Sequence, residues 1–231
     1  MDLHKFIKPA NGWKVPIWET LLDGSCRPFF HVQYRDWDKL KTAIFEMSEP
    51  HRHTFVDLGA NIGLISVPVK QYFKHVISVE PDPITAECLR CNMRDDQNGM
   101  RSGKYRVIEA AAGTHKDTIN LYTPANPKTS GYTSTTAHEG WTTQTVKQIS
   151  IDSLGLTRCD FLKLDVQGAE YHALMGAEQT VRLHKPIIYC ETKEGVECVD
   201  LLKSWGYKMM YDYQKGHVLL HHKKRWLASL R

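Results

Sequence analysis

Two carboxylates in this sequence each end an apolar run and are followed by a turn that contains glycine. Asp57 stands in "VDLGANIG", and Asp165 stands in "LKLDVQG". A charge at the end of a buried segment costs free energy unless it has a partner. We therefore interpret both carboxylates as parts of a site, and their chemistry suits a positively charged ligand.

The loop after Asp57 predicts a nucleotide pocket that has no phosphate cradle. Gly59 and Gly63 let the backbone turn sharply and approach a ligand closely. A dinucleotide fingerprint would also need glycine where Asn61 stands, because that glycine admits the pyrophosphate. A carboxylate just upstream repels phosphate but suits an ammonium or sulfonium group. The pattern favours S-adenosyl-L-methionine, and the residues expected to line it here are Asp57, Gly59, Ala60, Asn61 and Gly63.

Glu80 ends the next apolar run, "VISVE", 17 positions after Gly63. A nucleotide-binding fold places the carboxylate for the ribose hydroxyls about 20 residues on. A carboxylate offers two acceptor oxygens to two vicinal hydroxyls, and Pro81 and Pro83 stiffen the turn that follows. We expect Glu80 and Pro81 to lie at the cofactor.

The segment "EAAAG" ends a third apolar run and leaves two interpretations open. The small side chains of Ala110 and Ala111 would admit a flat adenine, and Glu109 could accept a hydrogen bond from its amino group. Three alanines are equally compatible with tight packing of a helix on a sheet. Glu109 and Ala110 are therefore candidate cofactor-binding residues.

The candidate catalytic carboxylates are Asp165, Glu191 and Glu170. Asp165 and Glu191 end two further apolar runs and could act as a general base. Glu170 lies in the first turn of the next helix, where a carboxylate also interacts well with the helix dipole. Gln167 could contact the substrate or be exposed. Acidic groups on one rim could coordinate a divalent cation, but no H-x-x-x-H or similar spacing supports one, and no metal ligand is predicted.

Other residues capable of chemistry have simpler interpretations. His138 and His172 are the only histidines expected near the site, and we interpret each as structural. Cys88 and Cys91 form a C-x-x-C, which could be half a zinc site or a redox pair. They stand inside a helical pattern without a second close pair, so we interpret them as packing thiols.

Alternating strands and helices predict the scaffold that positions these residues. Apolar strands are expected at 54–59, 75–80, 105–113, 159–166 and 185–192, and helices at 64–74, 83–96, 169–184 and 195–206. This alternation indicates an α/β, doubly wound sheet that is mostly parallel and covered by helices on both faces. Its ligands should sit at the carboxyl ends of the strands. The first and fourth strands should be neighbours, so that Asp57 and Asp165 face one cleft.

Two further pairs of strands are expected outside this alternation. The segments "KMMYDY" and "HVLLHHKK" predict a closing antiparallel pair, which would put one reversed strand in the edge region of the sheet. The segments "DTINLYTP" and "TVKQISI" look like added strands, and they flank the polar loop "ANPKTSGYTSTTAHEGW".

Composition excludes several classes of protein. The 231 residues are 42% hydrophobic and 24% charged, which is typical of a globular chain with one core. The net charge of +4 permits contact with a polyanion, but only "HHKKRW" is densely basic. No apolar run approaches the roughly 20 residues that span a bilayer, and the N-terminus lacks a signal-peptide pattern. The six cysteines fit reduced thiols, so we expect a cytoplasmic location.

The motifs together resemble the FkbM family of class I S-adenosylmethionine-dependent methyltransferases. The matching segments, in order, are "FVDLGANIGLISV", "VISVEPDP", "AAAG", "ISIDSL", "FLKLDVQGAEYHALMGA" and "KPIIYCET", over about residues 54–192. The resemblance implies a Rossmann-like sheet of seven strands with the residues around 57–63 and Glu80 at the cofactor. The family commonly has D-V-E-G after the fourth strand. Here Gln167 replaces that acid, so no role that needs a carboxylate is expected there.

The resemblance also divides the chain and suggests a reaction. Residues 53–231 would form the class I methyltransferase domain, and residues 1–52 an N-terminal extension that could act as a substrate lid. The expected reaction is O-methylation of a sugar, glycan or other small-molecule hydroxyl, with Asp165 or Glu191 as the base. The alternatives are a nucleic-acid methyltransferase, an NAD-dependent oxidoreductase and a non-catalytic cofactor-binding module. The first is disfavoured because "DVQG" stands where amino-directed base methylases have an Asn/Asp-Pro-Pro-aromatic motif. The acceptor and the oligomeric state cannot be read from the sequence.

Overall fold

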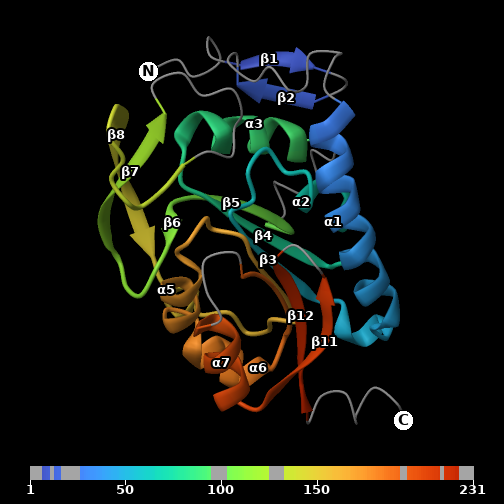
Figure 1. Cartoon of the computed structure of the whole chain (residues 1–231). Coiled ribbons are helices and arrows are strands. Elements are labelled where there is room, and N and C mark those ends of the chain that lie inside the picture. The colour runs from blue at the N-terminus through green and yellow to red at the C-terminus, as the bar shows by residue number, and fades with distance from the viewer. Residues whose placement is uncertain are drawn as a thin grey trace.

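Seven strands form the central sheet, in the order β11-β12-β10-β9-β3-β4-β5 (Figure 1). The computed structural model describes residues 7–10, 13–16, 27–94, 103–124, 133–192, 197–213 and 216–223. The strands are β3 (Thr54–Leu58), β4 (His75–Glu80), β5 (Tyr105–Glu109), β9 (Phe161–Leu164), β10 (Ile187–Glu191), β11 (Tyr207–Tyr213) and β12 (His217–His222).

The direction of the strands confirms the predicted mixed sheet. The five strands from β5 to β10 run parallel to their neighbours. β12 runs antiparallel to both β10 and β11, so the reversed strand lies one position inside the edge. The predicted adjacency of the first and fourth core strands is also confirmed, because β3 pairs with β9.

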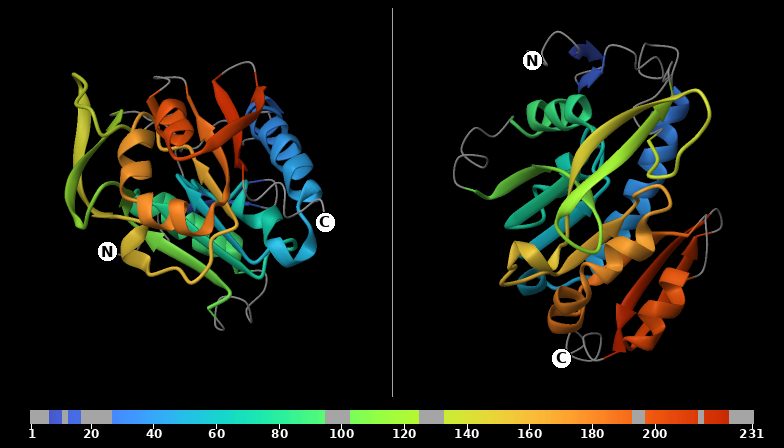
Figure 2. Two further views of the ribbon diagram at one scale, coloured as in Figure 1. Left: turned by 90° about the horizontal axis from the view of Figure 1, so that it is seen from below. Right: turned by 90° about the vertical axis from the view of Figure 1, so that its left-hand side faces the viewer.

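Helices cover both faces of this sheet, which is why its inner strands read as continuous apolar runs. One face packs against α1 (Arg27–Glu46), α2 (Ser66–Val69) and α3 (Pro83–Met93), and the other against α5 (Glu170–Met175), α6 (Glu178–His184) and α7 (Glu197–Ser204) (Figure 2). The described residues also form two short 3-10 helices, η2 (Glu49–His51) and η3 (Asp152–Leu154). Every residue of β3 and of β10 is buried as a result.

Two predicted helices differ from the structure. The helix expected at 64–74 is reduced to the four residues of α2, in which Pro68 has no amide hydrogen to donate. The helix expected at 169–184 is divided into α5 and α6 around Gly176. A Cβ atom at Gly176 would lie 1.9 Å from the carbonyl oxygen of Gly113, so the chain passes too close to another segment for any larger residue. Asp152 then accepts from the backbone N–H groups of Gln179 and Thr180 and caps α6.

The N-terminal part contributes to the same core. Leu40, Ala43 and Ile44 of α1 are fully buried in one cluster with Phe55 of β3. The division of the chain at residue 52 stays a prediction. Residues 125–132 of the polar loop and 224–226 of the basic segment lie outside the described residues, as do residues 1–6, 11–12 and 17–26 of the predicted lid.

Two smaller sheets flank the central one. The hairpin of β1 (Ile7–Ala10) and β2 (Trp13–Pro16) lies against α3, where the Asn92 side chain accepts from Lys14 N and donates to Lys14 O. The added strands predicted from the sequence form a second sheet beyond β5, in the order β6-β8-β7, from β6 (Ala111–Ala112), β7 (Asp117–Pro124) and β8 (Trp141–Ile149).

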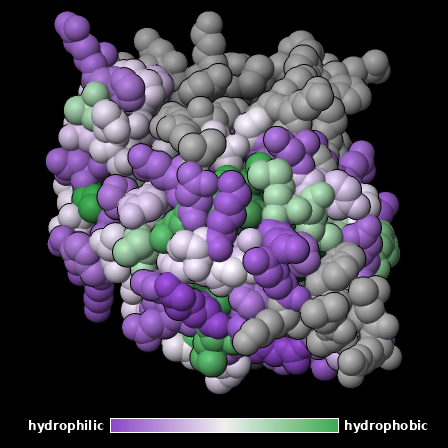
Figure 3. All heavy atoms as spheres, turned by 60° about the horizontal axis from the view of Figure 1, so that its bottom comes forward, coloured by the Kyte–Doolittle hydropathy of each residue, from purple (hydrophilic) through white to green (hydrophobic). Residues whose placement is uncertain are grey.

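The face of the molecule drawn in Figure 3 is mostly polar where its residues are described. In Figure 3, hydrophilic side chains predominate and apolar ones gather in small groups. Among the helices of the described residues, none combines the length and the apolar character that a membrane span requires.

Candidate active site

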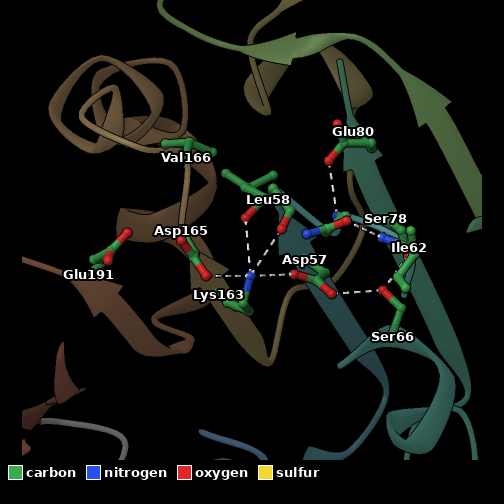
Figure 4. A network of polar contacts seen from close by, with 12 residues as sticks. Asp57, Leu58, Ile62, Ser66, Ser78, Glu80, Lys163, Asp165, Val166 and Glu191 are labelled. Carbon is green, nitrogen blue, oxygen red and sulfur yellow. Dashed lines mark hydrogen bonds and ion pairs between the residues drawn. The ribbon is translucent and has the colours of Figure 1, made fainter. Parts of the chain in front are cut away.

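Lys163 connects the two carboxylates that the sequence predicts for one site. Its Nζ lies 3.0 Å from Asp57 Oδ1 and 3.5 Å from Asp165 Oδ2 (Figure 4). The register of the parallel pair β3–β9 places Asp57 opposite Lys163, and Asp165 follows directly after β9. The structure therefore brings Asp57 and Asp165 together through a cation between them.

Lys163 is almost completely buried, with 5% of its side chain exposed. Burial by itself would lower the pKa of Lys163, but the carboxylates of Asp57 and Asp165 outweigh it and raise that pKa above its usual range. Its Nζ also donates to Gly59 O at 3.2 Å, which ties it to the glycine loop. The sequence pattern did not predict a role for Lys163, which is marked only by its position inside the apolar run "FLKLD".

Asp57 lies under the glycine loop and is fully buried. Its Oδ2 accepts from Ser66 Oγ at 2.7 Å, and Ser66 Oγ lies 2.7 Å from Ser78 Oγ on β4. Both carboxylate oxygens of Asp57 therefore have partners inside the protein. Its direct contact with a cofactor stays a prediction, while its contacts give it a role in supporting the loop.

The loop itself has positive φ angles at Gly59, Asn61 and Gly63. Gly59 has φ +70°, and a Cβ atom there would lie 1.8 Å from Asp165 O, so only glycine lets the loop pack against the end of β9. Asn61 has φ +51°, and its Oδ1 accepts from Ile62 N at 2.7 Å. Asparagine tolerates this conformation better than most residues. This explains how Asn61 occupies a position where a dinucleotide fold has glycine.

The other predicted loop residues have structural surroundings. Ala60 is buried in the core cluster on the α1 face. A Cβ atom at Gly63 would lie 2.8 Å from the Leu89 side chain, so the loop also packs closely on α3. Their contact with a cofactor is untested and stays a prediction.

Glu80 connects the glycine loop with the end of β4. Its Oε2 accepts from Asn61 N at 2.9 Å, and its Oε1 accepts from Asp82 N at 3.1 Å. Burial raises the pKa of Glu80 to about 8. Pro81, which stands between Glu80 and Asp82 in the sequence, is half-buried. The carboxylate keeps lone pairs for further hydrogen bonds, and two ribose hydroxyls would supply the donors.

The end of β5 brings Glu109 beside a different partner. Its Oε2 accepts from an Arg90 Nη atom at 2.8 Å, and the Glu109 side chain is 41% exposed. Ala110 is buried, and its N–H donates to Glu80 O at 3.2 Å. Contact of Glu109 or Ala110 with an adenine stays a prediction.

Glu170 accepts hydrogen bonds from the backbone of the loop after β9. Its two carboxylate oxygens accept from Val166 N at 2.8 Å and from Gly168 N at 3.0 Å. Burial raises the pKa of Glu170, and the two backbone N–H groups act against this shift and hold the carboxyl group inside the turn. A catalytic role for Glu170 stays untested, and its contacts give it a structural one.

Gln167 connects the predicted catalytic acids. Its Nε2 donates to Asp165 Oδ1 at 2.9 Å and to Glu191 Oε2 at 3.1 Å, from a backbone with φ +53°. In Figure 4, Glu191 lies on the far side of Asp165 from Lys163. Burial alone would raise the pKa of Asp165. The Lys163 ammonium, together with hydrogen bonds to Glu191 and Gln167 and the nearby His217, outweighs burial and lowers that pKa.

His217 lies next to Glu191 and was not predicted. The two residues are opposite one another in the antiparallel pair β10–β12, with His217 Nε2 4.0 Å from Glu191 Oε1. The predicted histidines are elsewhere: the ring of His138 packs on Trp141, and that of His172 on Tyr171. Polar contacts thus run from Asp57 through Lys163, Asp165, Gln167 and Glu191 to His217.

This arrangement at the carboxyl ends of parallel strands agrees with a comparison of the sequence with known families. The methyltransferase FkbM domain matches residues 57–209. The chain belongs to the FkbM methyltransferase family. The match begins at Asp57, and it includes Lys163, Asp165 and Glu191.

A solved structure of the FkbM family shows the same fold. The FkbM methyltransferase from Methylobacillus flagellatus KT is 21% identical, with a TM-score of 0.52 over 74% of this chain. This chain spans 44% of that protein's length. Two further structures are less similar. A methyltransferase from Geobacter sulfurreducens is 12% identical, with a TM-score of 0.46, and the match covers 85% of this chain and 80% of that one. A TehB-like SAM-dependent methyltransferase from Corynebacterium glutamicum is 12% identical, with a TM-score of 0.43, and the match covers 84% of this chain and 98% of that one. No curated protein sequence matches this chain.

The residues described around the FkbM-family site include no recognisable metal cluster. Within the described residues, no three or more His, Cys, Asp or Glu side chains form a group that could hold a metal ion. Cys88 and Cys91 are free thiols, and Cys88 packs in a cluster with Val15 and Ile62.

Proposed function

We propose that this FkbM-family methyltransferase uses S-adenosyl-L-methionine to methylate a hydroxyl group of a sugar, a glycan or another small molecule. The observation that carries the proposal is the polar network at one edge of the sheet. It joins the glycine loop after β3 to the acids after β9 and β10 through Lys163. One part of the network suits a nucleoside, and the other suits a hydroxyl nucleophile.

The residues of the glycine loop and of β4 fit this cofactor better than a dinucleotide. Glu80 is a buried carboxylate with free lone pairs for ribose hydroxyls. Asn61 replaces the glycine that a pyrophosphate would need, and the nearby carboxylates would repel a phosphate. When bound, S-adenosylmethionine would supply a methyl group that is already activated by a sulfonium. The work left to the protein is therefore mainly positioning and removal of the hydroxyl proton.

The contacts distinguish between the two predicted bases. Asp165 is held ionised by Lys163 and also accepts from Gln167, which makes it a weak proton acceptor. Glu191 lies further along the network, where its electrostatic effect on Lys163 is smaller than those of Asp57 and Asp165, and it accepts from Gln167 Nε2 at 3.1 Å. We therefore assign proton removal to the Glu191 side of the network and substrate positioning to Asp165.

Two measurements test the proposed function. Isothermal titration calorimetry with S-adenosylmethionine and with NAD should give binding of the first only. Transfer of tritium from [methyl-³H]S-adenosylmethionine should then be detected with at least one member of a panel of monosaccharides, oligosaccharides and simple alcohols. Binding of NAD alone would contradict the cofactor. Cofactor binding without transfer to any hydroxyl, or transfer only to RNA or DNA in a salt-sensitive manner, would support one of the alternative functions.

A further inference from the structure

Asn92 of α3 connects the N-terminal hairpin with the glycine loop. Its Oδ1 accepts from Lys14 N at 2.7 Å, and its Nδ2 donates to Lys14 O at 2.9 Å and to Ile62 O at 2.8 Å. Lys14 belongs to β2, which lies beside α3 (Figure 1), and Ile62 belongs to the glycine loop. Asn92 is buried. One side chain therefore holds two segments that are far apart in the sequence.

The amide of Asn92 matches the groups that it meets. An asparagine side chain has one acceptor oxygen and two N–H donors, and here it meets one N–H group and two carbonyl oxygens. Lys14 stands opposite Pro9 in the pair β1–β2, and Pro9 has no N–H to donate. Both backbone polar groups of Lys14 form hydrogen bonds with Asn92, so this side chain pairs with β2 as a neighbouring strand would.

The backbone of Ile62 lies between two residues with positive φ angles. Asn61 has φ +51° and Gly63 has φ +100°. The N–H of Ile62 donates to Asn61 Oδ1 at 2.7 Å, and its C=O accepts from Asn92. Two asparagine side chains thus satisfy the backbone of a buried residue. A residue other than glycine with positive φ is strained, so the loop needs such contacts to keep this conformation.

Apolar packing connects the same two segments. Val15 of β2 is fully buried in one cluster with Ile62, Leu64 and Cys88, and Trp13 packs against this cluster. The hairpin and the glycine loop therefore share a small core of their own. The hairpin precedes residue 57, where the match to the FkbM domain begins, so this support comes from outside the matched residues.

We propose that Asn92 is a positioning residue for the cofactor and that it makes the hairpin β1–β2 part of the cofactor site; this rests on the proposed function. The glycine loop is the segment expected at S-adenosylmethionine. A ligand binds more tightly to a loop that is already held in the bound conformation, and Asn92 and the hairpin hold it. Linkage then requires the reverse effect, so bound cofactor stabilises the docking of the hairpin.

Calorimetry with S-adenosylhomocysteine tests the positioning role. Asn92→Asp keeps the shape and the acceptor for Lys14 N but removes both N–H donors, and its Kd should rise about 10-fold or more. Asn120→Asp is the matched control, because it adds the same charge at an exposed position of β7, and its Kd should stay within about twofold of wild type. A wild-type Kd in Asn92→Asp would overturn the proposal. Absence of binding by the wild type would count against the proposed function itself, on which this proposal rests.

Val15→Ala decides the question if Asn92→Asp does not fold. It removes part of the apolar contact with Ile62, and its Kd for S-adenosylhomocysteine should rise about threefold or more because the loop loses support. The matched control is Val181→Ala, since Val181 is equally buried but lies on α6, on the other face of the sheet. It should lose a comparable amount of stability in urea and keep the wild-type Kd. Equal Kd values in the two variants would contradict the proposal.

Hydrogen exchange of the Lys14 amide tests the linkage, which a purely structural contact would not produce. Followed by NMR in the full chain, this exchange should be about fivefold slower or more when S-adenosylhomocysteine saturates the wild type. The slowing should disappear in Asn92→Asp, because the connection from Lys14 to Ile62 is broken. If the ligand leaves the Lys14 amide unchanged in the wild type, or slows it equally in Asn92→Asp, the proposal is wrong.

Discussion

Lys163 Nζ lies 3.0 Å from Asp57 Oδ1, and this buried ion pair connects β9 with the neighbouring strand β3. Asp165 is a second acid at the same ammonium, at 3.5 Å. One buried cation therefore lies between the two carboxylates. The glycine loop and the loop after β9 are thereby joined by one side chain.

We expect Lys163→Met to destabilise the protein by about 3–5 kcal/mol, because it leaves buried carboxylates without compensation. The change can be measured as the free energy of unfolding in urea at pH 7. Lys203→Met is the matched control, since Lys203 pairs with Asp200 at 3.2 Å on the surface, and it should cost less than about 1 kcal/mol. Equal stability of the two variants would show that the buried pair does not hold the loops together.

Glu80 should make the stability of the cofactor-free protein fall as the pH rises. Its pKa is raised from 4.5 to about 8 by burial, so the folded state binds a proton that the unfolded state has released. The contribution of Glu80 to the free energy of unfolding is fully present below about pH 4.5. It decreases progressively as the pH rises to about 8, by at most about 5 kcal/mol in total.

Urea unfolding between pH 4.5 and 8.5 checks this prediction in the wild type and in Glu80→Gln. The variant should lose most of the dependence on pH. Glu49→Gln, at an exposed carboxylate, should keep the wild-type slope. If the free energy of unfolding of Glu80→Gln still falls with pH as in the wild type, other groups cause the dependence on pH.

Gly59→Ala should be far more harmful than alanine at a glycine of similar backbone conformation. The new Cβ atom would lie 1.8 Å from Asp165 O, and φ is +70°. Gly140 has φ +75° but no atom within 4 Å of its added Cβ, so Gly140→Ala isolates the backbone strain, about 1–2 kcal/mol. We expect Gly59→Ala to exceed it by about 2 kcal/mol or more and to abolish cofactor binding, as measured by urea unfolding and calorimetry. Similar losses in both variants would mean that the two loops do not touch closely in solution.

The sequence was sufficient for the features that depend on local pattern. Asp57 and Asp165 could be assigned to neighbouring strands because apolar runs alternate with helices, and that alternation determines the topology. Lys163 was missed because one lysine in an apolar strand does not indicate which acids it will meet. His217 was missed for a similar reason, since its neighbour is set by the register of β10 with β12. The break at Gly176 depends on a contact with Gly113, far away in the sequence.

The last prediction concerns Gln167, which replaces the acid common in the family. Its single Nε2 donates to both Asp165 and Glu191, whereas a carboxylate in its place would face two like charges. We expect Gln167→Glu to destabilise the protein by about 1–2 kcal/mol at pH 8.

The destabilisation in Gln167→Glu should decrease as the pH falls. The new carboxyl group would have a raised pKa between its neighbours, and protonation restores a donor. Gln71→Glu, at an exposed side chain that donates to Pro68 O at 3.1 Å, is the matched control and should show no such recovery. Thermal unfolding of both variants from pH 4 to 8 measures the difference. If Gln167→Glu is as stable as wild type at pH 8, the hydrogen bonds from Gln167 do not hold Asp165 and Glu191 together. Their own strands must then position these two acids.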